Sequence, residues 1–181
     1  LLSQLDFKNE VNNLQRYKKN LENFNEYKIP SVYSDITQKY NNIIVMENIR
    51  GYTYSEIKEM EPDIQDNFGE LALKLGYISI LLTSSVNCDL HSGNLFFYID
   101  KHDNINNKKY KLGIIDFGIC YFPNVEDQIK YFNFFNKFLL TKDYSNLIDN
   151  SIGQFIEPKE VLNNMSLEMK NKLEKEIIYG V

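Results

Sequence analysis

Apolar residues recur at steps of three and four over residues 5–24, and this spacing predicts an amphipathic helix. The apolar positions are Phe7, Val11, Leu14, Tyr17, Leu21 and Phe24. At about 100° per residue, Glu10 projects into this stripe between Leu14 and Tyr17. A carboxylate that faces a core is costly without a cation. Two interpretations follow: Glu10 reaches water at the rim of the stripe, or it pairs with a lysine from an upstream segment.

Two segments rich in β-branched residues come next. Residues 29–36 (IPSVYSDI) and 41–49 (NNIIVMENI) predict two short strands with a turn near residues 37–42. Gly51 then interrupts the pattern, so we expect a lobe boundary there. The expected division is residues 1–50 and residues 51–181.

The remaining apolar patterns are mostly helical. Helices are expected at residues 55–66 around Pro62, 68–82, 125–139, 158–164 and 166–178. Residues 95–99 (LFFYI) and 111–115 (KLGII) are expected to form two strands joined by a polar surface loop. The aromatic residues of 125–139 indicate a helix buried in a core.

The composition is that of a soluble globular protein, with 181 residues, 43% hydrophobic and 25% charged. The net charge of -5 argues against a dedicated nucleic-acid binder, because phosphate backbones need a basic footprint. A nucleotide site remains compatible with that charge. Two cysteines form no disulfide framework, which favours a reducing, intracellular setting. No apolar run is long enough to span a bilayer.

Polar motifs stand at both ends of the expected hairpin. VNCDLHSGNLFF (86–97) places Asp89 five residues before Asn94, and LGIIDFG (112–118) ends in Asp116 and Gly118. Phosphoryl transfer needs an oriented nucleophile and a metal clamp on the phosphates. Asp89 would accept or orient the acceptor hydroxyl's proton, while Asn94 and Asp116 would supply oxygen ligands to Mg²⁺. Each motif alone is weak, but the two in this order around a hairpin indicate a kinase-type site.

Two other interpretations of these residues remain. Asp89 could form an Asx-type turn in a surface loop, with an ordinary turn at Asp116. Cys88, His91 and Cys120 could form a zinc site, although only three ligands are present. His91 is otherwise expected to pack beside the loop or to bond to the backbone.

The chain resembles the UbiB-like atypical protein kinases, also called the ADCK family, which are linked to ubiquinone biosynthesis. The matching segments are LDFKNEVNNLQRY, IPSVYSDI, IIVMENIRG, CDLHSGNLFF and GIIDFG, in family order from about residue 3 to residue 122. The resemblance implies a mixed α+β, protein-kinase-like fold with ATP bound between two lobes. Residues 1–50 would be a partial N-lobe with the kinase's helix C, two strands and the hinge, and residues 51–181 a mostly helical C-lobe.

The resemblance also implies roles for individual residues. Glu10 matches the helix glutamate that pairs with the ATP-contacting lysine, and Asp6 belongs to the family's E-x-D pattern. Residues Met46, Glu47 and Asn48 match the hinge whose backbone contacts adenine. The catalytic-loop pair would be Asp89 and Asn94, and the metal-binding aspartate would be Asp116.

The chain departs from the family pattern at several places. Gln4 stands where the family usually has Glu, and Asn87-Cys88 stands where it usually has His-Ala. The phosphate-covering loop, the V-x-K lysine and the K-x-G-Q element have no counterpart here. We therefore expect an N-terminally truncated kinase that alone binds nucleotide weakly and is inactive.

Two rival functions remain beside an ATP- and Mg²⁺-dependent kinase or ATPase. A small-molecule phosphotransferase of the aminoglycoside- or choline-kinase kind shares the catalytic loop, but commonly has an acidic residue where Gly118 stands. A non-catalytic pseudokinase would act as a binding module. Resemblance alone implies a nucleotide, a protein or lipid-like substrate and a peripheral association with membranes, in mitochondria or elsewhere.

Overall fold

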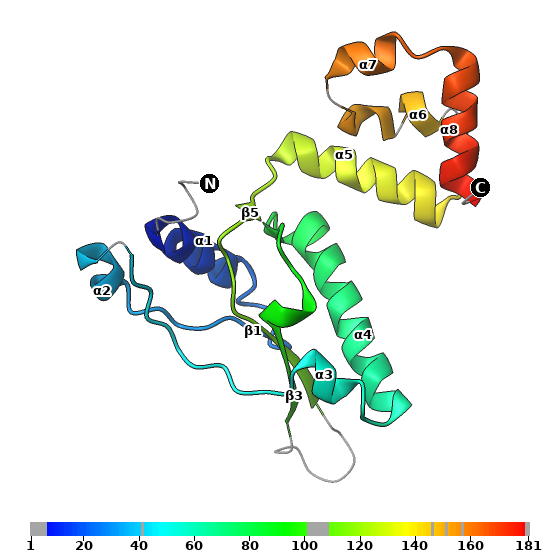
Figure 1. Cartoon of the computed structure of the whole chain (residues 1–181). Coiled ribbons are helices and arrows are strands. Elements are labelled where there is room, and N and C mark those ends of the chain that lie inside the picture. The colour runs from blue at the N-terminus through cyan, green and yellow to red at the C-terminus, as the bar shows by residue number, and fades with distance from the viewer. Residues whose placement is uncertain are drawn as a thin grey trace. The chain divides into compact units, whose positions relative to one another are not determined.

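The computed structural model describes residues 7–40, 42–100, 109–145, 147–150, 152–156 and 158–179. Contacts between residues divide the chain into two units, 1–123 and 124–181, and each is described by itself (Figure 1). The lobe boundary expected at Gly51 lies within the first unit and stays a prediction. Gln4 and Asp6 lie outside the described residues.

The first helix forms where the apolar spacing places it. Helix α1 spans Phe7–Asn20 and buries Val11, Leu14 and Tyr17. Tyr17 is fully buried, and its hydroxyl lies 3.0 Å from the hydroxyl of Ser79. The stripe of sequence positions is therefore a packed face of the first unit.

A three-stranded sheet forms the centre of the first unit. Strands β3 (Leu95–Asp100) and β4 (Lys109–Ile114) are the expected antiparallel hairpin, in which Phe97 pairs with Leu112. Strand β1 (Tyr27–Lys28) adds to β4 in parallel, which gives the order β1-β4-β3. Residues 101–108 of the hairpin loop lie outside the described residues.

Helix α4 (Pro62–Tyr77) packs against this sheet and continues as a π-helix, η2 (Ile78–Leu82). Phe68 of α4 meets Phe97 and Tyr110 edge-on, with ring centroids 4.9 and 5.2 Å apart. Figure 1 shows α4 running alongside β3 and β4. Aromatic pairs of this geometry add stabilisation beyond the burial of their area.

The prediction of one helix over 55–66 is wrong, because two separate helices cover this range. Helix α3 (Tyr54–Ile57) is a single turn with a capping box between Thr53 and Glu56. Helix α4 then starts at Pro62, whose ring suits the first helical position and cannot continue an earlier helix.

The prediction of two strands at 29–36 and 41–49 is also wrong. Residues Ser34–Lys39 form helix α2, which has Asp35 in its first turn. In the described residues, the two segments are joined by one isolated antiparallel bridge between Val32 and Met46 and by a hydrogen bond from the Ser31 N–H to the Glu47 carboxylate. Their β-branched residues favour extended backbone, but no regular ladder of pairs develops between them in the described residues.

The first unit also contains a two-stranded sheet. Strand β2 (Val86–Asn87) pairs antiparallel with β5 (Cys120–Tyr121), so Asn87 lies opposite Cys120. The two strands flank the polar motifs at 89–94 and 116–118. They therefore hold those motifs against each other at one place.

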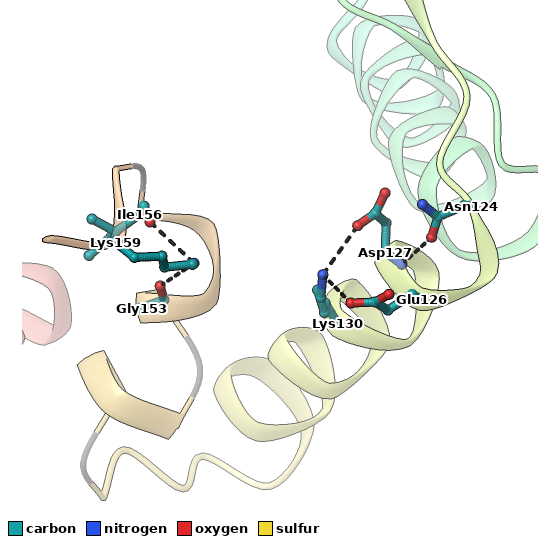
Figure 2. A network of polar contacts seen from close by, with 7 residues as sticks. All are labelled: Asn124, Glu126, Asp127, Lys130, Gly153, Ile156 and Lys159. Carbon is teal, nitrogen blue, oxygen red and sulfur yellow. Dashed lines mark hydrogen bonds and ion pairs between the residues drawn. The ribbon is translucent and has the colours of Figure 1, made fainter. Parts of the chain in front are cut away.

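The second unit begins with helix α5 (Val125–Phe135), which continues as a π-helix, η4 (Asn136–Leu140). The Asn124 side chain caps α5 by accepting from the Asp127 backbone N–H at 2.9 Å. Lys130 contacts Glu126 at 2.8 Å and Asp127 at 3.4 Å (Figure 2). The expectation that this helix is buried is wrong, because Ile129 and Phe132 are 55% and 56% exposed.

Four further helical segments follow in the described part of the second unit. They are α6 (Leu147–Asn150), the 3₁₀-helix η5 (Ile152–Phe155), α7 (Lys159–Asn163) and α8 (Leu167–Tyr179). The expected helices at 158–164 and 166–178 correspond to α7 and α8. The Lys159 ammonium donates to the carbonyls of Gly153 and Ile156, at 3.3 and 3.2 Å (Figure 2). None of the helices described in the two units is long and apolar enough to cross a membrane.

Candidate active site

Asp89 and Asn94 lie in the loop that connects β2 to β3. Asn94 ends a single 3₁₀ turn, η3 (Ser92–Asn94), and is buried, whereas Asp89 is exposed. The Asn94 side-chain Nδ2 donates to the Asp89 carbonyl at 3.2 Å. The Asn94 carbonyl accepts from the backbone N–H of Ile115 at 3.2 Å, one residue before Asp116. Asn94 therefore links the loop to the end of β4.

Asn87, two residues before Asp89, makes a further link. Its side-chain Nδ2 donates to the Asp116 carbonyl at 2.6 Å. Its Oδ1 accepts from the Asp89 backbone N–H at 3.0 Å. One buried amide thus ties the two aspartates together through their main chains. The only signal in the sequence is its position two residues before Asp89.

Asp116 begins the tight turn that follows β4. Its Oδ1 accepts from the Gly118 backbone N–H at 2.9 Å, which orients the carboxylate. Phe117 points the other way, is fully buried and lies 5.1 Å from the Tyr17 ring. The Phe117 carbonyl also accepts from Asn13 Nδ2 at 2.9 Å. Helix α1 therefore holds this turn from two positions.

Glu10 of α1 lies beside Asp116, although the two are more than 100 residues apart in the chain. Burial raises the pKa of Glu10, and the charge of Asp116 raises it further, while a hydrogen bond with the Phe117 backbone lowers it. The glutamate is thus an inward-facing carboxylate near a second carboxylate. A cation from elsewhere would relieve this repulsion, as the lysine interpretation supposes.

We expect Glu10→Gln to be more stable than the natural chain at pH 7. The pKa of Glu10 in the folded state lies above its ordinary 4.5, so the folded state binds this proton more tightly than the unfolded state does. The stabilisation of the folded state by this bound proton is present below pH 4.5 and is lost as pH rises through the folded-state pKa of Glu10. Urea unfolding from pH 4.5 to 7.5 should show the variant's advantage growing with pH. An advantage that stays constant over this range would contradict the prediction.

The segment Met46–Asn48 lies against residues 31–33. The Glu47 backbone N–H donates to the Ser31 carbonyl at 2.7 Å, and a Glu47 carboxylate oxygen accepts from the Ser31 N–H at 3.1 Å. Further along, Tyr52 bridges to Phe97 of β3. A Cβ on Gly51 would lie 2.8 Å from the Phe97 carbonyl, so glycine permits this approach. The segment is thereby joined to the strand that starts after Asn94.

The zinc interpretation gains no support from the structure. Burial raises the pKa of Cys120 to about 12, so this thiol is protonated at neutral pH. The His91 Nδ1 accepts from the Gly93 N–H at 3.1 Å, a bond to the backbone as expected. Over the described parts of the chain, no three His, Cys, Asp or Glu side chains are arranged to hold a metal ion.

The side chains of Asn94 and Asp116 are chemically suited to Mg²⁺. Because the Asn94 nitrogen is engaged by the Asp89 carbonyl, its Oδ1 is the atom left to face a cation. Asp116 offers a carboxylate whose orientation is set by Gly118. Magnesium prefers such oxygen ligands and usually takes only one or two from protein.

A family model described as the ABC1 atypical kinase-like domain matches residues 1–151. The chain belongs to the ABC1 atypical kinase-like family. The expected resemblance to UbiB-like kinases is thereby confirmed, because the ABC1 chain also matches UbiB proteins. It is 31% identical over 98 residues to the probable protein kinase UbiB of Actinobacillus pleuropneumoniae serotype 5b (strain L20). The same identity over the same length holds for UbiB of Glaesserella parasuis serovar 5 (strain SH0165).

Each of these matches covers 53% of the ABC1 chain and 18% of the relative, so the alignment spans less than a fifth of those proteins. A solved structure, the complex of Rv3197 with erythromycin from Mycobacterium tuberculosis, aligns with a TM-score of 0.57 and 21% identity. The alignment covers 82% of this chain and 34% of the Rv3197 chain. The expected fold class, mixed α+β and kinase-like, is confirmed.

Proposed function

We propose that this ABC1 domain takes part in ATP- and Mg²⁺-dependent phosphoryl transfer. The observation that carries the proposal is the set of hydrogen bonds around Asn87 and Asn94, which joins Asp89 to Asp116 through short links. Phosphoryl transfer depends mainly on positioning and on electrostatic stabilisation. A rigid frame that holds a carboxylate, an amide and a second carboxylate in one place meets that requirement.

In this proposal each residue has a separate task. Asp89, which is exposed, would orient the acceptor hydroxyl and take its proton. Asn94 and Asp116 would hold Mg²⁺, which neutralises charge on the phosphates when bound. The backbone of Met46, Glu47 and Asn48 would contact adenine, and Glu10 would orient a lysine toward the phosphates. The acceptor class, protein or lipid-like, follows from the resemblance alone.

We expect Mg-ATP to raise the melting temperature of the natural protein that contains this chain. A ligand in hundredfold excess over its Kd stabilises the folded state by about 2.7 kcal/mol. For a domain of this size, that corresponds to a shift of about 5–10 °C. Asp116→Asn, which removes a metal ligand at nearly constant shape, should abolish most of the shift.

Asp66→Asn is the matched control, because Asp66 is an exposed aspartate on α4 and the same change there should leave the shift intact. A shift that appears without Mg²⁺ and survives Asp116→Asn would point to the pseudokinase alternative. Transfer to choline or an aminoglycoside would favour the small-molecule phosphotransferase instead.

A further inference from the structure

A pocket of about 420 Å³ opens in the first unit where α3, α4 and β3 meet residues 90–92 of the loop between β2 and β3. Its volume lies within the usual range for small-molecule sites. The described residues that line it include none of those that we assign to the nucleotide, to the metal or to proton transfer, which are Glu10, Met46, Glu47, Asn48, Asp89, Asn94 and Asp116. The pocket is therefore distinct from the proposed phosphoryl-transfer site.

One wall of the pocket is apolar and belongs to the core of the first unit. It is made by four side chains that are at most 9% exposed, Ile57, Phe68, Leu95 and Phe97. The rings of Phe68 and Phe97 meet edge-on with centroids 4.9 Å apart, so each restrains the other. Close-packed side chains of this kind keep one arrangement. An apolar ligand would therefore meet a preformed surface, which lowers the cost of binding.

Gly69 of α4 leaves space in this pocket. A Cβ at this position would meet no atom within 4 Å, and the glycine does not adopt the left-handed backbone that favours this residue type. Inside a helix, glycine is about 1 kcal/mol less favourable than alanine. Neither the backbone nor the packing around Gly69 requires glycine, and a larger side chain there would occupy part of the pocket.

The polar rim of the pocket offers three hydrogen-bond donors. Lys58 contributes an ammonium, which lies 5.6 Å from the Tyr54 ring centroid and has no ion-pair partner among the described residues. The His91 Nδ1 accepts from the Gly93 N–H, so a neutral imidazole carries its proton on Nε2 and can donate it. Ser92 adds a hydroxyl. Since no aspartate or glutamate is among the described lining residues, the one formal charge of the lining is positive.

The segment that carries Lys58 is fastened to α4. The Gln65 Nε2 donates to the carbonyl of Lys58 at 3.3 Å and to the carbonyl of Met60 at 2.8 Å. The capping box between Thr53 and Glu56 fixes the turn that precedes it. The main chain of the lysine is thereby held beside the apolar wall, while its side chain stays exposed at the rim.

We propose that this pocket is a second ligand site, which binds a small carboxylate with an apolar body of up to about eight carbons. The apolar wall would cover the body, and the Lys58 ammonium would pair with the carboxylate. The His91 Nε2–H and the Ser92 hydroxyl are further donors for its oxygens. A cationic ligand would meet Lys58 as a like charge, and a neutral ligand would lose the charge-assisted bond, so the carboxylate is the head group that fits.

The test is an NMR titration of the ¹⁵N-labelled 181-residue chain with octanoate at low salt. We expect saturable shifts of the amide signals of Gly69, Leu90 and His91. Acetate, which lacks the apolar body, and octylammonium, which reverses the charge, should each bind at least about tenfold more weakly. Equal binding of octanoate and either control compound, or the absence of saturable shifts at these amides, would overturn the proposal.

A matched pair of lysine variants tests the head-group contact. Lys58→Gln should weaken octanoate binding by about tenfold, because it removes the charge that pairs with the carboxylate. Lys39→Gln is the control, since Lys39 is also an exposed lysine beside a tyrosine ring, 5.2 Å from the Tyr40 centroid, but does not line this pocket. Its affinity should be unchanged. Equal losses in the two variants would indicate general attraction to basic residues and would overturn the assignment.

A second pair of variants tests where the apolar body lies. Gly69→Leu should weaken octanoate binding by at least about tenfold, because the new side chain competes for the pocket. Gly76→Leu makes the same change in the same helix, also with no atom within 4 Å of the new Cβ, but outside this pocket. It should bind octanoate as the natural chain does. Equal affinities in the two leucine variants would overturn the assignment. Since no nucleotide is used, the outcome is independent of the test of phosphoryl transfer.

Discussion

Replacing Asp89 by asparagine is expected to slow phosphoryl transfer by about 10²–10⁴-fold in the natural protein that contains this chain. That is the usual contribution of a positioned general base. The frame around the residue should survive, because its hydrogen bonds to Asn87 and Asn94 use only the main chain of Asp89. The rate of ATP turnover under saturating Mg-ATP is the measurement.

Two comparisons make the Asp89 result specific. Mg-ATP should still raise the melting temperature of Asp89→Asn, because the proposed metal ligands are intact, whereas Asp116→Asn should lose most of that rise. Asp66→Asn, at an exposed position of α4, should turn over normally. Undiminished turnover in Asp89→Asn would remove this residue from the role of base.

Leu75→Ala should lower the free energy of unfolding by about 2–5 kcal/mol. Leu75 is fully buried where α4 packs into the core of the first unit. The substitution removes buried methyl groups and leaves a cavity that the surroundings fill only in part. Urea unfolding of the chain, with midpoint and slope compared, measures the loss.

Leu73→Ala is the matched control for this loss. It makes the same substitution two residues earlier in α4, but Leu73 is 63% exposed. The change in intrinsic helix propensity is the same for both variants, so their difference isolates burial. We expect Leu73→Ala to stay within about 0.5 kcal/mol of the natural chain. Similar losses at both positions would mean that α4 does not pack as described.

Two of the elements that periodicity predicts have one long buried face. Helix α1 follows its apolar stripe, and the hairpin of β3 and β4 follows two apolar runs around a polar loop. In each case the pattern extends over several residues that face the same core. The pattern therefore records which side is buried, and burial is what stabilises the element.

Other elements depend on contacts that the local pattern does not contain. Strand β1 has only two residues, too few for any period, and forms because β4 lies beside it. The β-branched residues of 41–49 predict a strand, yet within the described residues 42–49 only Met46 has a bridge partner. Helix α5 is rich in aromatic residues, yet Ile129 and Phe132 are more than half exposed, because composition alone does not say which side of a helix is buried.

The candidate site likewise contains residues that the sequence could predict and one that depends on distant contacts. The spacing of Asp89, Asn94 and Asp116 in the sequence pointed to one loop and one turn beside a hairpin, and the structure links these residues by hydrogen bonds. The position of Glu10 in an apolar stripe pointed to an unusual environment, and its pKa is raised. The role of Asn87 could not be predicted, because it depends on a strand pairing, β2 with β5, of only two residues each.

The link made by Asn87 has a consequence for how the site responds to acid. A carboxamide neither gains nor loses a proton between pH 5 and 8, whereas the histidine that UbiB-like kinases usually carry two residues before the catalytic aspartate would change its charge in that range. Mild acidification therefore leaves both of this side chain's hydrogen bonds, to Asp89 and to Asp116, in place. The part of the main-chain frame that Asn87 supplies therefore does not depend on pH in this range.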